Sequence, residues 1–101
     1  MKATTEDMKW MEPKVNAIME HVQQIDDIFE YFKATPHFLF EVVSNDFGGN
    51  PELIVSFWYE TRHYNGKHVK FTYQPAFGTI ESFINEIKAY MLDCVDGFIN
   101  L

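Results

Sequence analysis

The feature that most constrains this chain is a long stripe of apolar residues, spaced alternately three and four positions apart. The stripe consists of Met8, Met11, Val15, Ile18, Val22, Ile25, Phe29 and Phe32. This spacing keeps one face of an α-helix apolar over about seven turns. The pattern stops where Thr35 precedes Pro36, because a residue before proline is pushed out of the helical region. We therefore predict a regular helix over residues 13–34, about 33 Å long.

Pro13 divides this stripe, because proline cannot donate the helical hydrogen bond to the carbonyl four residues earlier. We place Pro13 in the first turn of the regular helix, where its missing donor is harmless. Residues 4–12 then form a separate or kinked turn, capped by Thr4 or Thr5. The same spacing is also a coiled-coil heptad, but three heptads are few and strands follow directly. We favour a helix that lies on a sheet.

The period changes to that of β-strands after the helix. Residues 37–45 and 53–61 are rich in aromatic and β-branched side chains, and a loop with two glycines separates them. Val69, Phe71 and Tyr73 alternate with polar residues and indicate a third strand. A second helix follows, capped by Thr79 and stopped by Gly97. The order is α-β-β-β-α, and we predict one α+β domain over residues 1–101, with a three-stranded antiparallel sheet and both helices on one face.

The register of the second hairpin decides which side chains share a face. A two-residue turn at Asn65 and Gly66 would mix charged and apolar residues on one face, so we predict a three-residue loop over 64–66 with a left-handed Gly66. This loop pairs Thr61 with Val69, Tyr59 with Phe71 and Phe57 with Tyr73, and sets Glu60 opposite Lys70.

The chain carries no phosphate-binding loop, nucleophile elbow or zinc-protease signature. Cys94 falls on the apolar side of the second helix near its C-terminal end, where the helix dipole opposes a thiolate. His63 and His68 flank the second turn, but two imidazoles are too few for a stable metal site. We therefore expect no enzymatic activity, no cofactor and no metal. A single cysteine also cannot form an internal disulfide, which is consistent with a reducing compartment.

Negative charge is concentrated in the first part of the chain. The 101 residues hold 15 acidic and 8 basic side chains, a net charge of −7, which argues against nucleic acid or an anionic membrane as the partner. The exposed stripe of the first helix is acidic. It is either an ordinary solvated surface or a docking site for a basic protein partner. The candidate residues are Glu20, Asp26, Asp27, Glu30 and Tyr31, with Asp46 in the first hairpin loop.

The outer face of the sheet is a second candidate surface, because an antiparallel sheet covered on one side normally has a polar outer face. Here the register places four apolar side chains among charged ones. They are explained by a partner protein, by a homodimer, or by cover from the N-terminal segment through Met8, Trp10 and Met11. The residues of this face are Leu39, Glu41, Val43, Ile54, Trp58, Glu60, Arg62, His68 and Lys70.

These observations favour a protein-binding module that masks a basic partner, most concretely an immunity protein that inhibits a nuclease toxin. One alternative is a small structural subunit that assembles with itself. Another is a secretion chaperone: the order of elements is similar to the first part of that fold, although those chaperones use further strands and a final helix to dimerise. Charged residues near the start replace the apolar stretch of a signal peptide, so we expect a cytoplasmic protein.

Overall fold

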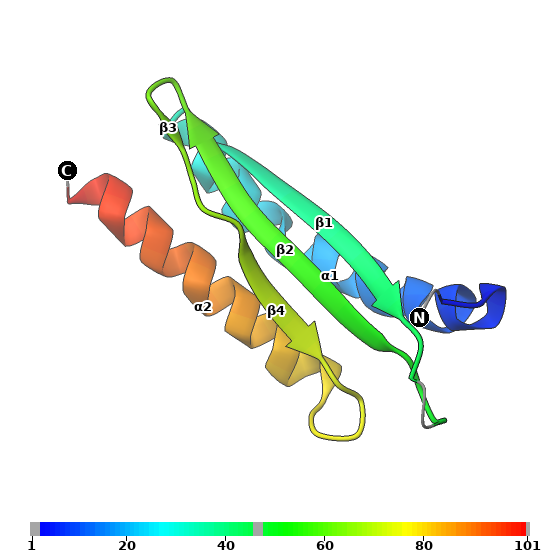
Figure 1. Cartoon of the computed structure of the whole chain (residues 1–101). Helices are drawn as coiled ribbons and strands as arrows, with labels where there is room; N and C mark the ends of the chain where they lie inside the picture. The colour runs from blue at the N-terminus through cyan, green and yellow to red at the C-terminus, as the bar shows by residue number, and fades with distance from the viewer. Residues whose placement is uncertain (1–2, 46–47, 101) are drawn as a thin grey trace.

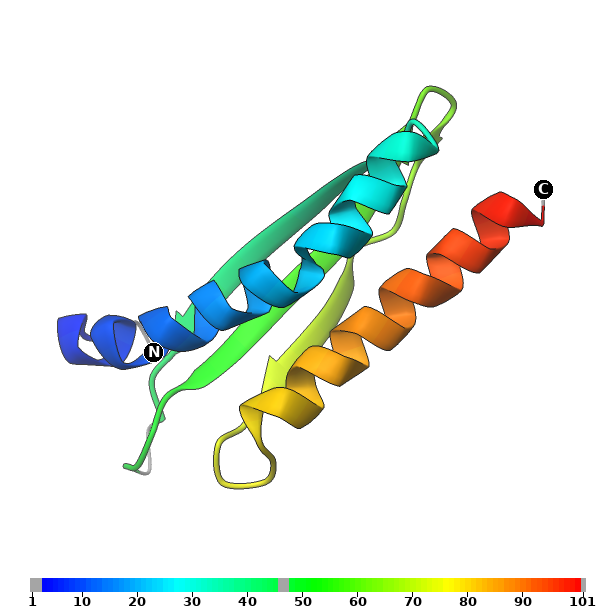
Figure 2. The same ribbon diagram turned by 180° about the vertical axis from the view of Figure 1, so that it is seen from behind.

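The computed structural model describes residues 3–45 and 48–100 and confirms the α+β fold. Its elements are α1 (Thr5–Tyr31), β1 (Thr35–Val43), β2 (Glu52–Thr61), β3 (Tyr64–Asn65), β4 (Val69–Tyr73) and α2 (Ile80–Ile99). The strands form one antiparallel sheet in which β2 pairs with all three others. Both helices lie on the same face of this sheet (Figures 1 and 2). Over the described residues, neither helix is long and apolar enough to cross a membrane.

The start of α1 differs from the prediction, because the helix begins at Thr5 and includes Pro13. Two features hold the turns before the proline. Thr4 and Asp7 form a capping box, in which each side chain accepts a hydrogen bond from the backbone N–H of the other. Met11 is fully buried in the core. The predicted bend is retained, since the first turns run at an angle to the rest of the helix (Figure 2).

The end of α1 also differs, because the helix stops at Tyr31 rather than at residue 34. Lys33 adopts a left-handed conformation with φ of 60°. The N–H of Ala34 donates to the carbonyl of Phe29, and that of Lys33 to the carbonyl of Glu30. This is the Schellman arrangement that ends a helix, with lysine where glycine is usual. The turn reverses the chain directly into β1.

The predicted register of the second hairpin was wrong, although the assignment of faces was right. The observed turn is Arg62-His63, with Thr61 paired to Tyr64, and Gly66 does not have a positive φ. Residues 66–68 then interrupt the strand, so that β3 and β4 are separate pieces. The shift is an even number of residues, which leaves Val69, Phe71 and Tyr73 on the inner face. The observed pairs are Phe57 with Val69, Val55 with Phe71, Leu53 with Tyr73 and Ser56 with Lys70.

The contacts of Gly66 explain why the turn lies at Arg62-His63 and not at the predicted residues 64–66. Its N–H donates to the carbonyl of Tyr59, and a Cβ atom built on it would lie 2.8 Å from that carbonyl oxygen. Glycine is therefore required here for close backbone approach and not for a left-handed turn. The predicted pair of Glu60 with Lys70 is absent, because Glu60 lies opposite Asn65 instead.

The core lies between the inner face of the sheet and the apolar stripes of the two helices. Phe29 is fully buried, and its ring makes edge-to-face contacts with Phe57, Tyr59 and Phe98 at centroid distances of 5.2–5.7 Å. Phe98 belongs to the last turns of α2, so this cluster joins the C-terminal ends of the two helices. Between the two helices, the strands β1, β2 and β4 alternate in direction along the sheet. The helices α1 and α2 consequently point the same way (Figure 2).

Candidate functional site

The parallel helices place their C-terminal ends side by side. The C-terminal end of a helix carries about half a negative elementary charge from its aligned peptide dipoles. Phe32 of the α1 C-cap lies 5.8 Å from the ring of Phe98, so the two negative ends are neighbours. An arrangement of this kind attracts cations and basic side chains.

Acidic side chains add to this negative potential. Residues 20–31 and 90–99 contain six acidic residues and no Lys or Arg. Neither helix has a basic residue in its last turn, although the exposed Lys33 follows the C-cap of α1. We call this region the acidic end. It comprises Asp26, Asp27, Glu30, Asp93 and Asp96 in the last turns of the two helices, the exposed Tyr31, and Glu20 about three turns before the end of α1.

Most of the acidic residues predicted for this surface do lie on it. Glu20, Asp27 and Glu30 are exposed, and the side chain of Tyr31 is 81% exposed. The side chain of Asp27 accepts a hydrogen bond from Gln23. The prediction for Asp46 falls outside the described residues.

Asp26 departs from the predicted solvated surface, because it is half-buried. Its Oδ1 atom is enclosed and has no hydrogen-bond partner among the described residues. Burial, followed by repulsion from Asp27 and Glu30, raises the pKa of this carboxyl from 3.8 to about 6. Asp26 therefore opposes folding at neutral pH instead of stabilising the helix.

We expect Asp26→Asn to raise the free energy of unfolding by about 1 kcal/mol at pH 7, a value reduced for partial solvent screening. Because the folded-state pKa lies above the unfolded one, the folded protein binds more protons between about pH 4 and pH 6. The wild type should therefore lose stability as the pH rises through this window, and the variant should show a flatter profile. Urea unfolding at several pH values measures both; identical profiles would contradict the assignment.

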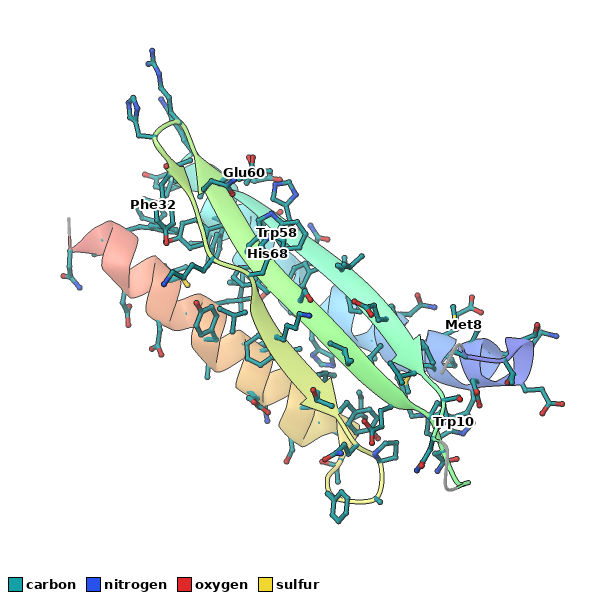
Figure 3. The ribbon with its side chains drawn as sticks, in the orientation of Figure 1. Met8, Trp10, Phe32, Trp58, Glu60 and His68 are labelled. Atoms are coloured by element: carbon teal, nitrogen blue, oxygen red, sulfur yellow. The ribbon has the colours of Figure 1, made fainter. Side chains whose placement is uncertain are left out.

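The outer face of the sheet is open. None of its nine predicted residues is buried, and Leu39 is 49% exposed. The proposed cover by the N-terminal segment is wrong, because Met11 is buried in the core beneath the sheet and Trp10 packs against that core. Figure 3 shows Met8 and Trp10 at one end of the sheet, away from Trp58.

An aromatic stack occupies the centre of this outer face. The ring of His68 lies 3.9 Å from that of Trp58 at an interplanar angle of 10°, and the ring of His37 lies 5.2 Å from it at 19°. Glu60 approaches Nε2 of His37 to 3.8 Å. Figure 3 shows Trp58, His68 and Glu60 together on this face. Trp58 is therefore sandwiched between two histidine rings and remains partly exposed.

Sequence reasoning missed His37, Phe77, Asp93 and Asp96. His37 faces outward because it pairs with Trp58 across the sheet, and strand alternation from Leu39 already indicated this. Phe77 is 84% exposed in the loop before α2, where it belongs to no periodic pattern. The two aspartates lie in the last turns of α2, whose end packs against that of α1 through Phe98.

The candidate catalytic and metal-binding groups remain apart. Burial raises the pKa of the Cys94 thiol, so this cysteine is not an activated nucleophile. His63 lies in the exposed turn, while His68 stacks on Trp58. In the described ranges 3–45 and 48–100, no group of three or more His, Cys, Asp or Glu residues could hold a metal ion.

Comparison of the chain with models of protein families, with curated proteins and with solved structures gave no match.

Proposed function

We propose that this protein is an acidic protein-binding module that masks a basic protein partner. An inhibitor of a cationic enzyme, such as an immunity protein for a nuclease toxin, is the most concrete form of this function. The observation that carries the proposal is the acidic end, where the neighbouring C-terminal ends of two helices carry exposed acidic side chains.

Local stability does not account for this arrangement. Acidic residues are favourable at the N-terminus of a helix and unfavourable at its C-terminus. Asp27 and Glu30 lie in the last turns of α1, and Asp93 and Asp96 lie in the last turns of α2. Asp27 is partly compensated by the hydrogen bond that it accepts from Gln23. Residues that break a local rule are candidates for a role in function.

An aromatic anchor is available beside the charges. Tyr31 is 81% exposed, and its ring is supported by an edge-to-face contact with Phe32 at 5.2 Å. Tyrosine is enriched in the centres of protein interfaces, where it combines apolar contact with a hydroxyl group. Long-range attraction by the acidic end followed by burial of Tyr31 would give fast and specific capture.

A second candidate function is assembly through the outer face of the sheet, as in a structural subunit or a secretion-chaperone-like protein. The aromatic stack around Trp58 and the half-exposed Leu39 on the same face favour it. This face points away from the helices, so a partner bound there would not contact the acidic end (Figures 1 and 2). Association through this largely apolar centre should respond weakly to salt.

The test is capture of basic proteins from a lysate of the native host by the immobilised protein, with elution by rising salt. We expect the double variant Asp27→Lys, Glu30→Lys to capture at least ten times less of the basic protein, because both side chains are exposed on the acidic end. Asp26 is left unchanged, because a lysine there would bury an ammonium group.

The matched control is Glu81→Lys, Glu86→Lys, which changes the net charge equally at the start of α2. This control should retain the captured protein. Equal loss in both variants would show that total charge, and not the acidic end, causes binding. Retention in both would contradict the proposal, and recovery of the protein's own copies that Trp58→Ala abolishes would favour assembly through the outer face.

A further inference from the structure

The free edge of β1 lacks the features that protect edge strands from pairing. β1 spans nine residues, and its register with β2 continues without a bulge from Thr35 to Val43. It contains no Lys or Arg, and Glu41 is its one charged residue. Pro36 blocks pairing only at its start. No other strand in the described residues pairs with this edge. A long, regular and apolar edge of this kind is a template for another strand.

The opposite edge of the sheet is protected in the usual ways. β4 has five residues, Lys70 points outward from it, and the interruption at residues 66–68 separates it from β3. Short length, an outward lysine and a break in the strand each discourage pairing. The contrast singles out β1 as the edge that accepts a partner.

The sequence of β1 is complementary to itself when antiparallel. A two-fold axis at Leu39 places it opposite its copy, sets Phe38 opposite Phe40 on the inner face and sets His37 opposite Glu41 on the outer face. Cross-strand aromatic pairs are favourable, and the Glu41 carboxylate can accept a hydrogen bond from the His37 ring. Each of these contacts occurs twice in a two-fold interface.

Apolar surface beside this edge would be covered at the same time. A groove of about 330 Å³ lies between α1 and β1, lined by Met8, Val15, Phe40 and Val42 with polar residues at its rim. Met8 is 52% exposed. Met19, four residues after Val15 on the same side of the helix, is 37% exposed. These side chains lie where a second helix would follow a second β1.

We propose that two copies of this protein form a homodimer by antiparallel pairing of β1 with β1 about Leu39, which joins the two sheets into one. Because the axis reverses the second copy, its acidic end lies at the opposite end of the dimer, and the dimer offers two such ends. This inference does not depend on the proposed function, since its test uses the protein alone.

The register is tested by cysteine cross-linking in a Cys94→Ser background. In the proposed pairing, the Cα atoms of Leu39 and its copy lie about 5 Å apart, within disulfide range. Glu41 lies opposite His37 of the copy, so the two Glu41 Cα atoms are offset by four residues, about 13 Å, along the strands. Under mild oxidation Leu39→Cys should form a covalent dimer at least ten times more completely than Glu41→Cys. Equal cross-linking of both, or of neither, would overturn the proposal.

The mass in solution gives an independent measurement. Light scattering on the wild type should give about twice the 11.9 kDa of one chain. Leu39→Lys should give a monomer with an unchanged circular-dichroism spectrum, because this side chain is half-exposed and the variant sets two lysines face to face. The control Thr72→Lys, on β4, should remain dimeric.

Three results would overturn the proposal. A wild-type mass of 11.9 kDa at every concentration would exclude the dimer. A dimer that resists Leu39→Lys and dissociates in Thr72→Lys would move the interface to the β4 side. A monomer that retains an extended peptide against β1 would assign this edge to a client segment.

Discussion

Phe29→Ala should lower the free energy of unfolding by about 3–5 kcal/mol, the range for a large aromatic side chain removed from a core. Phe29 is fully buried, and its ring contacts three other aromatic rings. The loss combines the removed apolar area with the cavity that remains, because strands and helices on every side cannot close around it. Urea unfolding followed by circular dichroism measures the change.

The matched control is Phe77→Ala, which removes the same atoms from a side chain that is 84% exposed. It should change the free energy of unfolding by about 0.5 kcal/mol or less. Similar losses in both variants would show that the cluster around Phe29 does not hold the protein together. Because this cluster joins the ends of α1 and α2, its loss should also weaken capture of a basic partner in the native state.

Gly66→Ala should lower the free energy of unfolding by about 2 kcal/mol, within the range for atoms forced into filled space. The new Cβ atom would lie 2.8 Å from the carbonyl oxygen of Tyr59, a backbone atom that cannot rotate away. Relief requires the backbone at residue 66 to move, which breaks its hydrogen bond to Tyr59 and shifts His68 from its stack on Trp58. Urea unfolding measures the loss.

Gly97→Ala is the control for this substitution. Gly97 lies within α2, and a Cβ atom there would meet no other atom within 4 Å. Alanine favours the helix over glycine by about 1 kcal/mol, so this variant should be more stable than the wild type. If Gly66→Ala also increased stability, the close approach to Tyr59 would not be a constraint on the hairpin.

Periodicity in the sequence predicted the helices, the strands and the inner face of the sheet. Strand alternation is insensitive to an even shift of register, so Val69, Phe71 and Tyr73 face the core although their partners were predicted incorrectly. The α2 helix was predicted from its Thr79 cap and apolar stripe, and it runs slightly beyond the expected stop at Gly97. An exposed glycine near a helix end weakens the helix without ending it.

Local signals failed where long-range contacts determine the conformation. Asn65 and Gly66 have the composition of a tight turn, yet the chain turns at Arg62-His63 and uses Gly66 for contact with Tyr59. Pro13 was expected to begin a helix, but burial of Met11 and the cap at Thr4 carry the helix through it. In each case several packed residues outweigh one residue's preference.

The sequence by itself determined the class of fold, the composition of the core and the acidic surface of α1, because these depend on spacing along the chain. Only the tertiary structure decided that the C-terminal ends of α1 and α2 pack together through Phe32 and Phe98. It also decided that Asp26 loses its solvation and that the edge of β1 is free. These features depend on which elements become neighbours in space, and the packing of the whole chain determines this.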